Sequence, residues 1–189
     1  MNAKIDISSV VLKTERLTLR PWRQTDLDDF YEYASVDGVG QMAGFVPHKN
    51  KEESQSILNR FIENKKTFAL EYQGKVIGSL GIEKYREDRF PEFDHQMGRE
   101  IGYVLSKDYW GQGLMPEAVR EVIRYLFEDV GVDFILCAHF LSNRQSARVQ
   151  EKCGFRHYGF GEYHTRFGTV EPDETNILTR VAWENHEGK

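Results

Sequence analysis

The sequence predicts one mixed α/β domain with a single central sheet. Strand-like and helix-like segments follow one another in the order strand, two helices, three strands, helix, strand, helix and two strands. Two apolar runs flank Gln73-Gly74, a tight-turn pattern that predicts a hairpin and therefore antiparallel pairing. Later, the stretch YWGQGL (109–114) joins a strand to a long amphipathic helix and then to another strand, which predicts a parallel crossover.

Periodicity places one strand, two helices and the hairpin in the first half of the chain. Apolar residues alternate with polar ones in the strand and recur at helical spacing in the two helices. Thr25 or Asp26 is a candidate cap for the first helix. The expected segments are a strand at 16–22, helices at 27–34 and 52–64, hairpin strands at 67–72 and 75–85, and a polar loop at 86–97.

The second half alternates strands with two further helices. Ser142 or Asn143 can cap the second of these, which runs to Lys152 before Gly154 stops it. The expected segments are a strand at 99–106, an amphipathic helix that ends near Gly131, a buried strand at 134–140, and late strands at 155–167 and 174–183.

Composition excludes several classes of protein. The chain has 189 residues and no internal repeat or linker, which predicts one domain over 1–189. A net charge of −5 without a basic run argues against a nucleic-acid binder. No apolar run approaches the roughly 20 residues of a membrane helix, the N-terminus lacks a signal-peptide pattern, and the two cysteines form no CxxC, so we expect a cytoplasmic protein. The six histidines lack metal-ligand spacing, and no metal site is predicted.

The two glycines of YWGQGL have two interpretations. They form either a plain strand-to-helix turn or a loop that binds an anion, because a helix N-terminus offers free N–H groups and glycine lets the backbone approach a phosphate. Two common phosphate motifs do not fit: Pro116 stands where a dinucleotide fingerprint has its third glycine, and no GK[ST] tripeptide occurs in the chain.

EIGYVLSKDYWGQGLMPEAV, followed by NRQSARVQEKCGF, resembles the GNAT superfamily of N-acetyltransferases. The opening TERLTLRPWRQTDLDDFYEY is similar to the branch that includes ribosomal-protein alanine acetyltransferases, and the resemblance covers about residues 12–183. It implies a mostly antiparallel sheet of about six to seven strands with one splayed parallel pair, flanked by about four helices.

The resemblance also implies an acetyl-CoA site. Its glycine loop would hold the pyrophosphate, and the strand before it would offer backbone groups to the pantetheine arm. The residues carried over are Trp110, Gly111, Gln112, Gly113, Leu114 and Met115 for the pyrophosphate, and Tyr103, Val104 and Leu105 for the pantetheine. Asp108 departs from the looser pattern, which has Gln or Arg there, so backbone donors are expected to carry more of the phosphate binding.

Transfer to an amine requires a deprotonated amine and a proton for the leaving thiolate. The resemblance implies that Glu100 is the base, often acting through water. A solvated strand-edge carboxylate beside Arg99 is the alternative interpretation.

Asn143 and Ser146 lie three residues apart on one predicted helix face. Helix capping alone explains Asn143. The resemblance implies that Asn143 contacts the pantetheine arm or a water and that Ser146 bonds the CoA sulfur and returns the proton. Many members place a tyrosine acid seven residues after the asparagine. Gln150 stands there, which leaves Ser146 as the expected substitute.

Cys153 is expected to be a small buried residue ahead of Gly154-Phe155, and His139 to be structural because it lies inside an apolar strand.

The expected function is acetyl-CoA-dependent N-acetylation of a primary amine. Segments 35–47, 86–97 and 165–173 are candidate walls of the acceptor site. By analogy with the branch, a protein N-terminal amine is the first expectation, and a polyamine or aminoglycoside remains open. A non-catalytic acyl-CoA-binding module is the alternative of a different class. The protein is expected to act as a monomer or homodimer.

Overall fold

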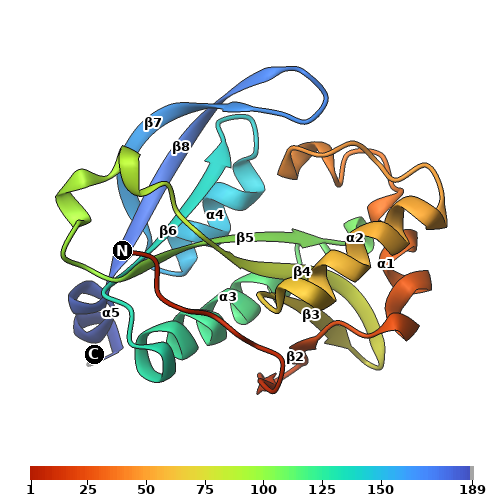
Figure 1. The fold of residues 1–189 in the computed structure, drawn as a ribbon, viewed down its shortest axis with the longest axis horizontal. Coiled ribbons are helices and arrows are strands. Elements are labelled where there is room, and N and C mark those ends of the chain that lie inside the picture. The colour runs from red at the N-terminus through yellow and green to blue at the C-terminus, as the bar shows by residue number, and fades with distance from the viewer. Residues whose placement is uncertain (188–189) are drawn as a thin grey trace.

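One eight-stranded sheet forms the centre of the computed structural model, which describes residues 1–187 (Figure 1). The strand order is β1-β2-β3-β4-β5-β6-β8-β7, and β5 and β6 are the parallel neighbours. The strands are β1 (Leu12–Lys13), β2 (Leu17–Pro21), β3 (Thr67–Tyr72), β4 (Lys75–Glu83), β5 (Gly98–Leu105), β6 (Phe134–Phe140), β7 (Arg156–His164) and β8 (Val170–Thr179). The predicted fold class is confirmed, with short β1 beyond the expected strands. Residues 188–189 of the expected domain lie outside the described part.

Helices cover both faces of this sheet. They are α1 (Leu27–Ala34), α2 (Lys51–Asn64), α3 (Leu114–Arg124), α4 (Arg144–Lys152) and α5 (Arg180–Glu187). Phe30 of α1 and Leu58 of α2 form a cluster with Ala69 of β3. Val119 of α3 belongs to a second cluster, with Ile101 of β5 among its members. The expected helix end near Gly131 is confirmed, since a π-helical turn (Tyr125–Val130) extends α3 to that glycine.

Two local predictions are wrong. Asp26 stands at the N-cap position of α1, but neither its side chain nor that of Thr25 makes a capping hydrogen bond. Instead, the buried Asp26 carboxylate accepts bonds from the Arg20 guanidinium at 2.9 Å. The expected late strand over 174–183 ends at Thr179, because Phe134, the partner of Thr179, is the first residue of β6. The chain continues as α5, and Trp183 packs its ring on Phe127 at 5.2 Å.

Candidate active site

The parallel strands β5 and β6 separate after three paired positions. Their ladder ends at Glu100 and Leu136, although β5 continues to Leu105 and β6 to Phe140. A cavity of about 840 Å³ lies along this opening and extends from the glycine turn to β7 and β8. Every site residue predicted from the sequence lines it except Gln112.

The glycine turn leaves a row of backbone donors free. Gly111 and Gly113 both have φ of +76°, which favours glycine, and an added Cβ at Gly111 would meet no atom within 4 Å. The first backbone bond of the turn into α3 is Glu117 N–H to Gly113 O. Among the described residues, the N–H groups of 111–115 donate to no other group. Together with the helix dipole, they form a cradle that fits a pyrophosphate.

Side chains from distant segments hold the turn in place. Arg16 donates to the Gln112 carbonyl at 3.0 Å and pairs with Glu117, in the first turn of α3, at 2.7 Å. The Trp110 indole N–H donates to the Leu105 carbonyl at 2.9 Å. Gln112 folds its own side chain back to the Asp108 carbonyl at 3.2 Å, which explains its absence from the cavity wall. The cradle is therefore fixed before any ligand arrives.

The backbone of β5 offers polar groups to the opening at alternate residues. Ser106 N–H donates to Ile77 O of β4, and the alternation of an antiparallel ladder then directs the N–H and C=O of Val104 to β4. The same groups of Tyr103 and Leu105 face the opening. Val104 lines the cavity, but its backbone groups, contrary to expectation, are used within the sheet.

Two cations on α4 also line the cavity, and neither was predicted as a site residue. Arg148 and Lys152 lie one helical turn apart, so they project from the same side of α4. Asp108 supplies no cation at its own position of the turn, and α4 adds two cations that line the same cavity. Their i,i+4 spacing within NRQSARVQEK was visible in the sequence, but the proximity of α4 to the turn was not.

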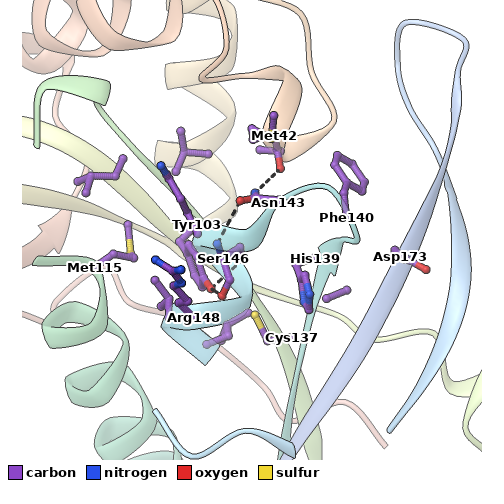
Figure 2. Close-up of a pocket in the computed structure, with 18 of the residues that line it drawn as sticks. Met42, Tyr103, Met115, Cys137, His139, Phe140, Asn143, Ser146, Arg148 and Asp173 are labelled. Carbon is purple, nitrogen blue, oxygen red and sulfur yellow. Dashed lines mark hydrogen bonds between the residues drawn. The ribbon is translucent and has the colours of Figure 1, made fainter. Parts of the chain in front are cut away.

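Hydrogen bonds fix the Ser146 hydroxyl, and Figure 2 shows the one that joins it to Tyr103. Gln150 donates from Nε2 to Ser146 Oγ at 3.2 Å, and Asn176 of β8 orients that amide by donating to Gln150 Oε1 at 2.7 Å. The Tyr103 hydroxyl lies 3.0 Å from Ser146 Oγ. Burial raises the pKa of Tyr103 well above its usual value, so the tyrosine keeps its proton. Gln150 is thus a donor to Ser146 Oγ, and either hydroxyl of the Tyr103–Ser146 pair can donate to the other, since Tyr103 can also donate to the Ser146 carbonyl at 3.3 Å.

Asn143 has the capping role predicted for it and one more. Its side-chain oxygen accepts from Ser146 N at 3.1 Å, which confirms the cap of α4. Its Nδ2 donates to the Met42 carbonyl at 3.3 Å, so the residue ties α4 to the short helix η2 (Gln41–Ala43) across the cavity (Figure 2).

Glu100 is a central-strand carboxylate, so the alternative of a solvated sheet edge is wrong. Arg99 is buried and donates to the Ala3 carbonyl, and does not form a surface pair with Glu100. Burial, with Glu83 directly across on β4 and Asp173 on β8, raises the pKa of Glu100 to about 7. Arg89 opposes this change in pKa. A carboxyl that titrates near neutrality in a cavity suits a general base.

All three segments predicted as walls of the acceptor site contribute residues to the cavity lining. Val39, Met42 and Ala43 come from the first, Arg86, Arg89 and Phe90 from the second, and Asp173 from the third. Phe140 and Tyr163 also line it, and their rings pack at 5.5 Å. Neither ring was predicted from the sequence, since nothing local places β7 over this cavity.

His139 and Cys137 line the cavity, whereas Cys153 is not among its lining residues. His139 Nδ1 is buried without a hydrogen-bond partner within the described chain, and Nε2 lies 3.6 Å from Glu174. Burial raises the pKa of Cys153 to about 11 and that of Cys137 further, which disfavours a nucleophilic thiolate. Residues 1–187 contain no group of three or more side chains arranged to hold a metal ion, and none of their helices has the length and apolar character for a membrane span.

Comparisons with known proteins agree with this architecture. The acetyltransferase (GNAT) domain model matches residues 16–156. An uncharacterized N-acetyltransferase of Bacillus subtilis, YoaA, is 27% identical over 186 residues, which cover 90% of this chain and 96% of that protein.

Two solved structures share the fold. Ribosomal-protein-S5-alanine acetyltransferase from Vibrio fischeri has a TM-score of 0.71 at 22% identity and covers 93% of this chain and 99% of its own. Microcin C7 self-immunity acetyltransferase MccE, solved with acetyl-CoA and AMP, has a TM-score of 0.71 at 16% identity. The match covers 87% of this chain and 93% of that protein.

The fold and the opened strand pair thus define an acyl-group transferase. Because the family model covers most of its length, the chain belongs to the GNAT N-acetyltransferase family, whose members use acetyl-CoA.

Proposed function

We propose that this protein transfers the acetyl group of acetyl-CoA to a primary amine by direct attack. One observation carries the proposal: the opening between β5 and β6 has Glu100 on one side of the sheet and the Ser146 hydroxyl on the other. Side chains alternate along a strand, so Glu100 and Tyr103 point to opposite faces of β5. A base and an acid therefore meet the same gap from two directions.

Different groups of the chain would bind different parts of acetyl-CoA. The N–H groups of 111–115 would hold the pyrophosphate, with Arg148 and Lys152 available to its phosphates. Tyr103 and Leu105 would bond the pantetheine arm through their backbone, and the Leu105 N–H faces the gap where oxyanion charge develops. Acetyl-CoA, when bound, supplies the activated thioester.

Two proton transfers complete the reaction. Glu100, ionised above about pH 7, accepts the amine proton directly or through a water. Ser146, held by Gln150 and Tyr103, donates its proton to the departing sulfur and regains one from solvent or through Tyr103. No covalent acetyl-cysteine is required, in keeping with the inert thiols.

The acceptor class is a separate question. A protein N-terminal amine is the first candidate, because the fold matches ribosomal-protein alanine acetyltransferase. A small amine is the second candidate, and the acidic side chains Glu100 and Asp173 on the cavity wall would suit its ammonium form.

CoA release with a panel of amines tests the proposal. Peptides with free N-terminal Ala or Ser, polyamines and amino acids are each incubated with acetyl-CoA. We expect turnover with at least one class and loss of turnover in Ser146→Ala with acetyl-CoA binding retained. Tight CoA binding without turnover on any amine would instead identify a non-catalytic acyl-CoA-binding module.

A further inference from the structure

The acceptor half of the cavity carries charges of both signs. Glu100 and Asp173 form an acidic side, and Arg89 of the short helix η3 (Glu87–Arg89) lines the same cavity. Arg89 lies near enough to lower the pKa of both carboxyls. An ammonium group alone would require only the acidic side.

No ion pair or side-chain hydrogen bond within residues 1–187 holds the Arg89 side chain in its position. Its neighbour Arg86 is engaged by Asp88, at 2.6 Å, and so its charge is satisfied. The Arg89 guanidinium makes no ion pair or side-chain hydrogen bond with any residue in 1–187, and it is exposed at the cavity wall. A guanidinium presents a planar fork of donors that matches a carboxylate in two parallel bonds.

Contacts between loops fix the walls around this part of the cavity. Tyr158 of β7 donates to Glu92 and packs its ring on Phe90 at 5.2 Å, which joins the 86–93 segment to β7. Arg166 N–H donates to the Gly44 carbonyl at 3.3 Å, which joins the β7–β8 turn to the segment after η2. β7 and the β7–β8 turn are thus held against both neighbouring segments.

We propose that the acceptor is a small amino acid, with its amine directed to Glu100 and Asp173 and its carboxylate bound by Arg89. This inference rests on the proposed acetyl transfer and names the substrate class of that site. The two sites of opposite charge also set the orientation, since a reversed ligand would oppose carboxylate to carboxylate and ammonium to guanidinium.

Matched acceptors test the inference on the intact protein. Free α- and ω-amino acids are compared with their amides and with diamines of the same length, by CoA release. We expect kcat/KM for the free acids to exceed that for the amides by about tenfold or more. Arg89→Gln should abolish this preference without changing the acetyl-CoA KM, and Arg89→Glu should reverse it toward diamines.

Arg86→Gln is the matched control, because Arg86 lines the same cavity but is already paired, and it should keep the preference. Equal turnover of amides and acids, an unchanged preference in Arg89→Gln, or turnover confined to peptides would overturn the inference while leaving acetyl transfer intact. Absence of CoA release with every amine would overturn the proposed function itself.

Discussion

Replacing Glu100 by glutamine removes a charge that the fold holds at a cost. The ordinary carboxyl pKa of 4.5 is raised to about 7 by burial and by Glu83 and Asp173. A pKa difference of one between the folded and unfolded states corresponds to about 1.4 kcal/mol, so ionised Glu100 lowers the free energy of unfolding by about 3 kcal/mol. Partial exposure of the side chain reduces this to about 2 kcal/mol.

The upward direction of the Glu100 pKa change determines how stability depends on pH. Because the pKa is higher in the folded state, the stabilising contribution of protonated Glu100 is complete below 4.5 and is lost as pH rises through about 7. Glu100→Gln lacks this loss. Its free energy of unfolding relative to wild type should therefore increase by about 2 kcal/mol between about pH 5 and about pH 8.5.

Urea unfolding of both proteins at the two pH values measures this difference. The same variant should lose acetyl transfer, while the pH profile of wild-type kcat/KM rises with an inflection near the Glu100 pKa. Glu83→Gln is the matched control: without the opposite carboxylate, the inflection should move to lower pH. An unfolding difference independent of pH would refute the buried, pH-titrating carboxylate, and an unchanged rate in Glu100→Gln would refute its role as base.

Three further outcomes follow from the same geometry. Gly111→Val forces a β-branched residue to φ of +76° beside the cradle, and the KM for acetyl-CoA should rise about tenfold or more in steady-state assays. Tyr103→Phe removes the hydroxyl that is hydrogen-bonded to Ser146 Oγ, and kcat should fall about tenfold while the acetyl-CoA KM, measured in the same assay, stays constant. Phe134→Ala empties a fully buried site that packs on Phe93 at 4.4 Å, and should cost about 3–5 kcal/mol in urea unfolding.

Local patterns in the sequence determined most of the secondary structure. The hairpin at Gln73-Gly74, the helices at 51–64 and 144–152 and the Asn143 cap are each encoded within a few residues. Local patterns did not predict features that depend on a neighbouring strand. Residues 180–183 have strand-like composition but lie beyond the end of the partner strand β6, so they continue as helix.

The sequence alone also pointed to the glycine turn, because positive φ, a helix start and free N–H groups are properties of one short stretch. Only the tertiary structure decided how distant groups act on one another. It buries Arg99 against Ala3 and places Glu83 and Asp173 around Glu100. A pKa depends on charge and solvent within a few ångströms, and those neighbours are far apart in the chain.

Ser146 shows the same division. The sequence shows the three-residue spacing between Asn143 and Ser146, but it does not show that Gln150 bonds the Ser146 hydroxyl. That contact depends on Asn176 of β8, which orients the Gln150 amide, and Tyr103 of β5 reaches the same hydroxyl from another strand. Hydrogen bonds are directional and short, so three stretches of sequence that share no local pattern become one site only when the sheet brings them together.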